Sequence, residues 1–483
     1  MNGSPAPFRA KPIAFGTDGW RGVIAAEFTF ERVSHVAPIA AQVLKDTYGK
    51  STGSNTVIVG YDRRFMAEDF ARVTADAVAA AGFDVLFSES FASTPAFSWA
   101  AKHRSALGAI VMTASHNPAS YLGLKVKGAF GGSVPPEITQ KIEDKLGKDT
   151  PLAATPGKIE TFDPWPEFCA DLRTKANIGA IQKAIAAGDL TVFVDVMHGS
   201  ASGGVGKILE ATVNELRSDS DPTFGGGAPE PLPKYLGDML AKVKAHGETS
   251  SGLTVGLVFD GDGDRIAAVD GKGNFLSSQI LIPILLQHLA ERRGLSGELV
   301  KTVSGSDLMP RVAALYDLPV FETPVGYKYI ADRMLGGDVL LGGEESGGIG
   351  YNTHIPERDA LLSALYVLEA VVESGKDLSE LYAALQDRAK FHASYDRIDL
   401  PLASMDVRAK LLDRLATEPP TEVAGKAVKE MTNPDGYKFR MADDSWLLIR
   451  FSGTEPVLRL YCEASDMTQV QATLEWARQW AEG

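Results

Sequence analysis

The sequence Asp260-Gly261-Asp262-Gly263-Asp264-Arg265 places three carboxylates at alternate positions directly after an apolar segment. The intervening glycines allow the backbone to curl, so that all three side chains can point at one spot. Carboxylates that lie so close repel one another unless a cation lies among them. Oxygen ligands of this kind suit Mg²⁺, Mn²⁺ or Ca²⁺. The spacing predicts a divalent metal site, with a solvated acidic turn as the alternative.

A calcium loop between two helices fits these residues less well. Such a loop needs a glutamate at its twelfth position, and position 271 is glycine. The segment before the loop, residues 253–259, is a continuous apolar run and reads as a buried strand. A Ca²⁺-binding or sugar-phosphate-binding protein without catalysis stays open as the non-enzymatic alternative.

A second candidate site is Thr113-Ala114-Ser115-His116-Asn117-Pro118, which follows the apolar segment 109–112. A serine beside a histidine at a strand end can be a nucleophile or a phosphate carrier, although most such sequences only shape a turn. From Ser90 to Pro136 the chain has no Asp or Glu. The basic residues of this stretch include Lys102, Arg104, Lys125 and Lys127. Such surroundings suit a serine that bears two negative charges better than the nucleophile of a hydrolase.

Two further loops combine glycines with polar side chains. Residues 342–348 hold Glu344, Glu345 and Ser346, whose oxygens can bond sugar hydroxyls. Residues 450–456 hold two hydroxyls in a tight turn, which with Arg450 and Arg459 would form an anion-binding nest. The alternatives are a plain flexible loop and a hairpin turn with surface arginines.

Alternating strand and helix patterns must position these loops. Strands are predicted at 57–59, 84–87 and 108–112, with a helix at 66–81. Further strands are predicted at 191–196, 253–259, 298–303 and 338–341. Several of them run into glycine-rich or acidic loops, at the edge where open α/β sheets bind ligands. We infer three related α/β units with parallel sheets.

The last ninety residues follow a different pattern. Short strands are predicted at 437–441, 446–451 and 458–464, followed by a helix at 467–480. This order predicts a separate α+β domain at the C-terminus.

Composition excludes several classes of protein. The 483 residues carry 48 Lys and Arg against 62 Asp and Glu, a formal net charge of −14, whereas nucleic-acid binders show a basic balance. No apolar run reaches the roughly 20 residues that span a bilayer. The first twelve residues lack the apolar core of a secretory signal. Two cysteines argue against a disulfide framework. We expect a cytoplasmic protein that binds neither nucleic acid nor membrane.

In this order, the four loops resemble those of the α-D-phosphohexomutase family, which comprises phosphoglucomutases, phosphomannomutases and relatives. The match extends from Phe15-Gly16-Thr17-Asp18-Gly19-Trp20-Arg21-Gly22 to Arg459. It implies three similar α/β domains plus a C-terminal α+β domain of the TATA-box-binding-protein-like type around a central cleft. The expected boundaries are 1–162, 163–274, 275–391 and 392–483.

The resemblance also implies roles for single residues. Ser115 would be the phosphorylated serine, and Asp260, Asp262 and Asp264 would hold Mg²⁺ together with Ser115. The residues implied in catalysis are Ser115, Lys125, Arg21, His116 and His354, with Lys125 as the general base. The residues implied in substrate binding are Glu344, Ser346, Gly326, Tyr327, Lys328, Arg265, Arg358, Arg450, Ser452, Gly453, Thr454 and Arg459.

The implied activity is the interconversion of hexose 1-phosphate and hexose 6-phosphate through a phosphoserine and a hexose 1,6-bisphosphate. Mg²⁺ would be the cofactor and glucose 1,6-bisphosphate the activator of a monomer or homodimer that binds small sugar phosphates. The segment His354–Asp359 resembles a pattern of phosphoglucomutases and favours glucose. Gly348 stands where some members have His, Val325 where many phosphoglucomutases have Thr, and Leu122 where Asn is common. A phosphomannomutase and a glucose 1,6-bisphosphate synthase stay open as alternatives.

Overall fold

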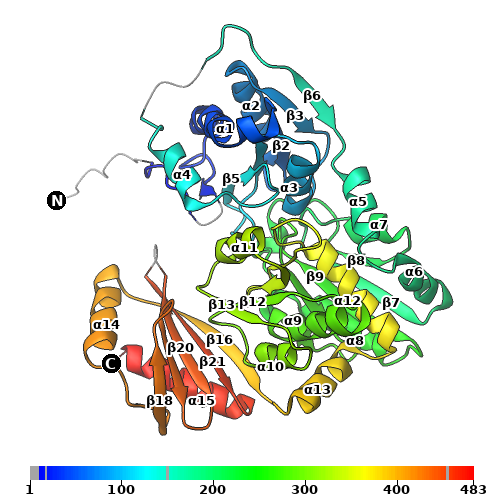
Figure 1. The fold of residues 1–483 in the computed structure, drawn as a ribbon, viewed down its shortest axis with the longest axis vertical. Helices are drawn as coiled ribbons and strands as arrows, with labels where there is room; N and C mark the ends of the chain where they lie inside the picture. Colours follow the sequence, from blue (N-terminus) through cyan, green and yellow to red (C-terminus); the bar gives the residue numbers. More distant parts are fainter. Residues whose placement is uncertain (1–9, 17–18, 148–151, 453–455, 483) are drawn as a thin grey trace.

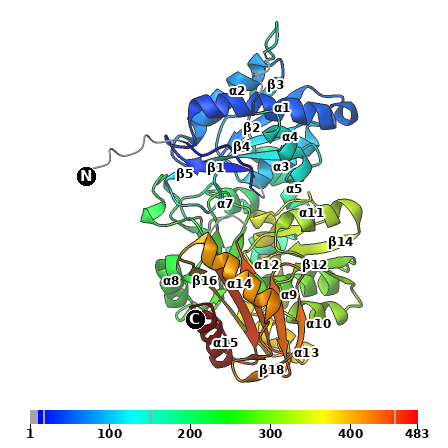
Figure 2. The same ribbon diagram turned by 90° about the vertical axis from the view of Figure 1, so that its left-hand side faces the viewer.

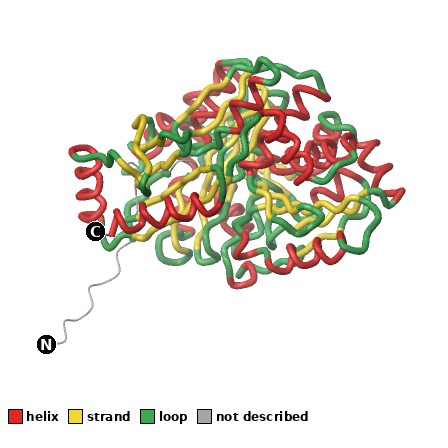
Figure 3. The backbone as a smooth tube through the Cα atoms, turned by 90° about the horizontal axis from the view of Figure 1, so that it is seen from below, coloured by secondary structure: helices red, strands yellow, loops and turns green. Residues whose placement is uncertain are grey.

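The structure is a computed structural model that describes residues 10–16, 19–147, 152–452 and 456–482. Four β-sheets organise this part of the chain. In Figure 1 the N-terminal sheet lies at the top, the C-terminal sheet at the lower left and the two middle sheets to the right of it, and Figure 2 shows the same molecule from the side. Seen from below, strands lie mostly inside and helices mostly at the periphery (Figure 3).

The first α/β unit has a six-stranded sheet in the order β1-β5-β4-β2-β3-β6. Its strands are β1 (Trp20–Val23), β2 (Thr56–Tyr61), β3 (Asp84–Ser88), β4 (Gly108–Met112), β5 (Tyr121–Gly128) and β6 (Ile159–Phe162). Its helices are α1 (Phe30–Thr52), α2 (Ala67–Ala80), α3 (Thr94–His103) and α4 (Pro136–Glu143).

The second unit has a five-stranded sheet in the order β11-β10-β9-β7-β8. Its strands are β7 (Leu190–Asp195), β8 (Asn214–Leu216), β9 (Leu253–Phe259), β10 (Ile266–Val269) and β11 (Phe275–Leu276). Its helices are α5 (Trp165–Arg173), α6 (Ile178–Ala187), α7 (Gly204–Leu209), α8 (Gly237–Gly247) and the 3₁₀ turns η1 (Phe224–Gly226) and η2 (Pro233–Tyr235).

The third unit has a four-stranded sheet in the order β13-β12-β14-β15. Its strands are β12 (Glu298–Thr302), β13 (Val320–Thr323), β14 (Val339–Gly343) and β15 (Ile349–Tyr351). Its helices are α9 (Ser278–Gln287), α10 (Leu308–Ala314), α11 (Tyr327–Gly336), α12 (Ala360–Ser374), α13 (Leu378–Ala389) and a π-helical turn, η3 (His288–Arg292).

The three units share one order for four core strands, which confirms the inferred repeat: β5-β4-β2-β3, β10-β9-β7-β8 and β15-β14-β12-β13. Each contains three parallel strands in a β-α-β-α-β arrangement, and a fourth strand pairs antiparallel with the last of them. The antiparallel pairs are β4–β5, β9–β10 and β14–β15. The sheets therefore have the expected parallel core, with an antiparallel strand added that the sequence did not indicate. The loops that close these pairs contain Ser115, the three aspartates and Glu344, so the same hairpin loop carries the polar residues in each unit.

The C-terminal unit is an antiparallel sheet in the order β16-β21-β20-β19-β18-β17. Its strands are β16 (Ser394–Pro401), β17 (Glu422–Val423), β18 (Lys426–Thr432), β19 (Tyr437–Met441), β20 (Trp446–Phe451) and β21 (Val457–Ala464). Its helices are α14 (Met405–Thr417) and α15 (Met467–Glu482). This order confirms the α+β arrangement expected at the C-terminus.

Helix α12 ties the second and third units together. It is buried along most of its length and contacts α6, α9 and β9. A helix that is apolar on all sides is stable only inside a core. Asp359 begins it, because its side chain accepts a hydrogen bond from the Leu362 amide at 3.0 Å. Within the described residues, no helix combines the length and apolar character needed to cross a bilayer.

Candidate active site

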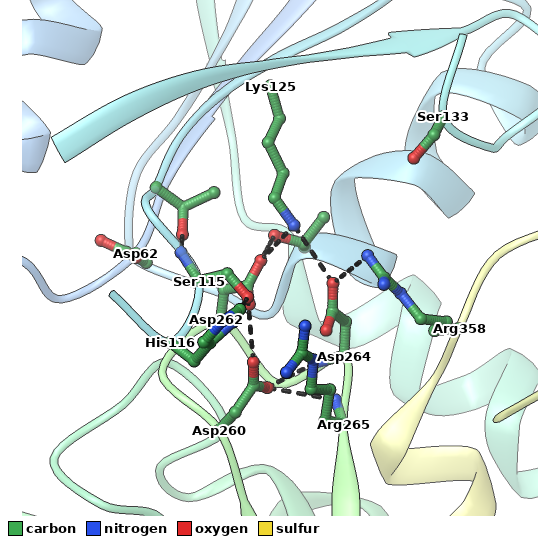
Figure 4. Close-up of polar contacts among 12 residues, drawn as sticks. Asp62, Ser115, His116, Lys125, Ser133, Asp260, Asp262, Asp264, Arg265 and Arg358 are labelled. Carbon is green, nitrogen blue, oxygen red and sulfur yellow. Dashed lines mark hydrogen bonds and ion pairs between the residues drawn. The ribbon is translucent and has the colours of Figure 1, made fainter. Parts of the chain in front are cut away.

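Ser115 lies in the β4–β5 loop and is 1% exposed. Its backbone is left-handed, with a φ of 52°. Its Oγ donates to Asp260 Oδ2 at 3.1 Å and lies 3.3 Å from His116 Nδ1 (Figure 4). Burial, with Arg265 and Arg21 nearby, lowers the pKa of His116 well below its ordinary value. A neutral imidazole therefore lies beside the serine hydroxyl.

The β9–β10 loop brings its three aspartates together. Asp260, Asp262 and Asp264 are fully buried, and one oxygen from each lies within 4.8 Å of the others. Burial and the neighbouring Asp264 and Asp262 raise the pKa of Asp260 well above its ordinary value. Burial alone would also raise the pKa of Asp262, but Lys125, Thr94 and Arg358 together lower this pKa.

Two cationic side chains donate hydrogen bonds to the aspartates. Lys125 comes from β5, and its Nζ donates to Asp262 Oδ2 at 2.8 Å and to Asp264 Oδ2 at 3.1 Å. Arg358 precedes α12, and its Nη2 donates to Asp264 Oδ2 at 2.8 Å (Figure 4). These contacts join the first, second and third units around one buried charge cluster.

The aspartate cluster fits a divalent cation. Among the described residues, no hydrogen-bond donor reaches Asp262 Oδ1 or Asp264 Oδ1, although both oxygens are buried. Unsatisfied buried oxygens are costly, and carboxylate oxygens are the ligands that Mg²⁺ prefers. With the nearby oxygens of Asp260 and Ser115, they form a ligand set made of oxygen alone.

The β14–β15 loop joins the metal loop directly. Arg265 forms an isolated β-bridge with Gly348, and Ile266 donates its amide hydrogen to the Gly347 carbonyl at 3.0 Å. Burial raises the pKa of Glu344 to about 6, and Arg358, whose Nη1 lies 3.6 Å from Glu344 Oε2, opposes this rise. The two loops that the sequence predicted separately therefore form one wall of the site.

A large cavity opens beside this wall. Its volume is about 830 Å³, and all three later units contribute residues to it. Ser346 and Glu345 of the β14–β15 loop line it, together with Lys234 of the second unit and Arg397 of β16. Arg397 Nη1 donates to Glu345 Oε1 at 3.0 Å, so the C-terminal unit contacts the loop directly.

The two predicted anion-binding arginines are neighbours on the C-terminal sheet. Arg450 on β20 pairs directly with Arg459 on β21. Arg450 Nε donates to Asp435 Oδ2 at 2.8 Å, and the same oxygen accepts the Val325 amide hydrogen at 2.9 Å. Ser452 follows at the end of β20 and is 8% exposed. The predicted residues Gly453 and Thr454 lie outside the described residues.

Not all predicted residues meet at the aspartates. His354 contacts two carboxylates elsewhere, with Nε2 3.0 Å from Asp359 Oδ2 and Nδ1 3.4 Å from Asp171 Oδ2. Arg21 Nη1 donates to Asn117 Oδ1 at 2.5 Å, in the loop that carries Ser115.

The predicted residues of α11 are divided. Tyr327 is buried beneath Arg358, whose Cζ lies 5.2 Å from the ring centroid. Gly326 precedes it at the start of the helix, and the half-buried Lys328 lies with its Nζ 4.9 Å from the Tyr329 ring centroid. Of this group, Tyr327 is thus the residue that supports a site side chain.

Sequence reasoning missed several residues that hold the loops. Thr94, at the start of α3, donates its hydroxyl to Asp262 Oδ2 at 2.6 Å. Arg64 and Asp62 lie behind the Ser115 loop, and Asp435 bridges two units. Their local sequences resemble ordinary turns and caps. The lack of acidic residues from Ser90 to Pro136 was a usable signal for Thr94, which lies inside that stretch.

Known protein families match most of the chain. Four families of the phosphoglucomutase/phosphomannomutase group match the chain: alpha/beta/alpha domain I at residues 12–152, domain II at 166–273, domain III at 277–389 and the C-terminal domain at 407–476. A phosphoglucosamine mutase of Frankia casuarinae is 31% identical over 475 residues, which cover 95% of this chain and 96% of the relative.

Two further relatives match over nearly the full length. A phosphoglucomutase/phosphomannomutase of Thermococcus kodakarensis is 28% identical and covers 95% of this chain and 96% of its own. The solved structure of a candidate phosphomannomutase of Thermus thermophilus is 34% identical, with a TM-score of 0.84, and covers 98% of this chain and 100% of its own. With four family matches in order and these relatives, the chain belongs to the phosphoglucomutase/phosphomannomutase family and is a phosphohexomutase, an intramolecular phosphotransferase.

Proposed function

We propose that the protein interconverts glucose 1-phosphate and glucose 6-phosphate, with Ser115 as the phosphoryl carrier and glucose 1,6-bisphosphate as intermediate and activator. The observation that carries this proposal is the 3.1 Å contact between Ser115 Oγ and Asp260 Oδ2 inside a buried aspartate cluster. A phosphate ester on this hydroxyl would lie within reach of a cation bound by the same aspartates. The four-domain division at residues 162, 274 and 391 belongs to the same proposal.

One turnover needs two phosphoryl transfers, the first from Ser115 to the sugar phosphate and the second from the bisphosphate to Ser115. The bond between phosphorus and Ser115 Oγ breaks while the oxygen of a sugar hydroxyl forms a new bond to phosphorus. We assign the proton of that hydroxyl to Lys125 Nζ, which requires Lys125 to be uncharged and released from Asp262 and Asp264. The bisphosphate then turns around, and its other phosphoryl group forms a bond to Ser115 Oγ while the bond from phosphorus to the sugar oxygen breaks. That oxygen takes back the proton held by Lys125. Loss of the phosphate to water must be limited, as the burial of Ser115 implies.

Mg²⁺ bound by Asp260, Asp262, Asp264 and Ser115 would neutralise charge on the transferred phosphoryl oxygens. The other predicted residues have simpler tasks. Arg21 orients the Ser115 loop through Asn117, and Arg265 and Arg358 provide positive charge at the aspartates. Arg450, Arg459 and the turn from Ser452 would hold the phosphate that is not transferred.

Charge pairing in the sugar loop supports a neutral sugar. Glu344 lies beside Arg358, and Glu345 accepts a hydrogen bond from Arg397. Both carboxylates therefore have a cationic partner, and neither is left to balance the ammonium group of an amino sugar. Glucosamine phosphate is nonetheless the second candidate, because the Frankia casuarinae relative is named a phosphoglucosamine mutase. Mannose phosphate is the third.

A substrate panel tests the proposal. We expect glucose 1-phosphate, with Mg²⁺ and a trace of glucose 1,6-bisphosphate, to give a higher kcat/KM than mannose 1-phosphate or glucosamine 1-phosphate. A higher kcat/KM for either alternative would reject glucose as the substrate. Accumulation of the bisphosphate from a phosphoryl donor, without isomerisation, would instead identify a bisphosphate synthase.

A further inference from the structure

The guanidinium of Arg64 lies directly behind the Ser115 loop. Its Nη2 donates to the carbonyl oxygens of Ser115 at 2.6 Å and Asn117 at 2.7 Å. Its Nη1 donates to those of Pro118 at 3.1 Å and Tyr121 at 3.2 Å. One side chain thus bonds three backbone carbonyls of the β4–β5 loop and that of the first residue of β5. All four are bonds from a charged donor, which are stronger than those between neutral groups.

Arg64 is itself held firmly. It is 4% exposed, and its Nε lies 3.4 Å from Asp62 Oδ2. Asp62 Oδ1 accepts the Arg64 amide hydrogen at 2.9 Å. On the other side, Arg64 Cζ lies 4.9 Å from the ring centroid of Phe224 in the second unit. A buried cation with a carboxylate on one side and an aromatic ring on the other has little freedom to move.

The Ser115 loop needs such a support. A left-handed backbone is rare for a residue with a side chain and costs of order 1–3 kcal/mol, so it persists only where the surroundings impose it. Thr113 Oγ1 accepts the Ser115 amide hydrogen at 2.9 Å, and Arg64 holds the Ser115 carbonyl from the other side. Together these bonds fix both peptide planes that flank Ser115.

We propose that Arg64 is a positioning residue for phosphoryl transfer, which holds the Ser115 loop so that Oγ points at the aspartate cluster. None of these bonds joins Arg64 to the Ser115 side chain or to Asp260, Asp262 and Asp264. Arg64 therefore acts through the backbone. Only a planar group with several divergent N–H bonds can reach four carbonyls, so lysine cannot replace it. The inference rests on the proposed role of Ser115 as phosphoryl carrier.

The test compares two neighbouring arginines. Arg64→Lys keeps the charge opposite Asp62 but loses the fork, and Arg64→Met removes both. Arg63→Lys and Arg63→Met are the matched controls, because Arg63 is half-buried and bonds the Ser218 carbonyl at 2.8 Å, away from the loop. The wild-type protein is first shown to carry phosphate on Ser115 and to interconvert hexose phosphates. Failure at this step would reject the proposed function and leave Arg64 without a role in catalysis.

With wild-type activity established, the rate of phosphoryl transfer is measured in a single turnover, alongside steady-state kcat and KM. We expect Arg64→Lys to lower the transfer rate and kcat by about 10-fold and Arg64→Met by about 100-fold, since misplacing a reacting group by about 1 Å costs on the order of 10²-fold. KM should change less than about threefold, because uniform substrate binding is untouched.

Three results would overturn the proposal. They are an unchanged transfer rate in Arg64→Lys, a rise in KM with kcat unchanged, and an equal loss of kcat in the Arg63 controls. If Arg64→Met does not fold, Arg64→Lys alone decides, because its charge against Asp62 is retained.

Discussion

At Glu344, the environment of one side chain sets a measurable pH dependence. Burial raises the pKa of Glu344 to about 6, above an ordinary value of 4.5. Between pH 4.5 and about 6, the folded protein therefore holds a proton on Glu344 that the unfolded chain has already lost. Stability from this group is greatest below pH 4.5 and falls as the pH rises through about 6.

Glu344→Gln removes this titration. A pKa of about 6 in place of 4.5 corresponds to about 2 kcal/mol, so the variant should gain about 2 kcal/mol over the wild type between pH 4.5 and pH 7. Urea unfolding of both proteins at the two pH values measures this difference. Glu373→Gln, at an exposed glutamate of α12, serves as the control and should show no such gain. A difference between Glu344→Gln and wild type that stays constant with pH would contradict the account.

Residues of the candidate site were predictable where their chemistry requires a local sequence pattern. Three aspartates at alternate positions and a serine after an apolar strand indicate their chemistry in the sequence itself. Arg64 and Asp435 were not predictable, because their partners include Phe224, 160 positions from Arg64, and Val325, 110 positions from Asp435. The catalytic role implied for His354 stays a prediction, and packing places its two ring nitrogens beside Asp171 and Asp359.

At the scale of elements, the β14–β15 loop depends on a position without a side chain. Any Cβ at Gly348 would overlap Arg358 Cδ. Gly348 thus leaves room for Arg358 to reach both Asp264 and Glu344. This gives a physical reason for glycine where some family members have histidine.

Gly348→Ala should displace Arg358 and lower kcat/KM by about 10–100-fold, from the loss of about 1.5–3 kcal/mol of charged hydrogen bonding. The control is Gly336→Ala, because a Cβ there meets no atom within 4 Å. Steady-state kinetics on both variants measures the effect. Equal kcat/KM in the two variants would show that Arg358 does not need this space.

The paired strands β20 and β21 carry the proposed phosphate-binding element. Arg450 and Arg459 are direct cross-strand partners in these strands. Arg450→Ala should raise KM for hexose phosphate by about 10–100-fold and change kcat less, because the phosphate it binds does not react. Arg478→Ala on the exposed face of α15 is the control. An unchanged KM in Arg450→Ala would reject this phosphate site.

Strands made of apolar residues were predicted from the sequence, whereas β5, which carries polar residues of the candidate site, was not. The segments before the loops, such as β4 and β9, are continuous apolar runs, and both were predicted with their observed bounds. Strand β5 was missed because Lys125, Lys127 and two glycines break the apolar pattern. Both lysines are nevertheless buried, since Lys125 reaches the aspartates and Lys127 donates to Glu357 at 2.6 Å.

At the scale of the molecule, one repeated hairpin explains how distant residues meet. Three units with the same core strand order each present the same loop, and the loops carry Ser115, the three aspartates and Glu344. Their convergence depends on how the units pack, which no local pattern encodes. The resemblance to a known family predicted this arrangement, whereas periodicity alone predicted only the repeat.

The most direct test of the account is the chemical state of Ser115. The protein is incubated with glucose 1,6-bisphosphate and Mg²⁺, and its peptides are analysed by mass spectrometry. We predict one phosphate on Ser115 and none on Ser120, an exposed serine of the same loop, together with loss of nearly all turnover in Ser115→Ala but not in Ser120→Ala. Near-normal turnover in Ser115→Ala, or an active enzyme without phosphate on Ser115, would contradict the account.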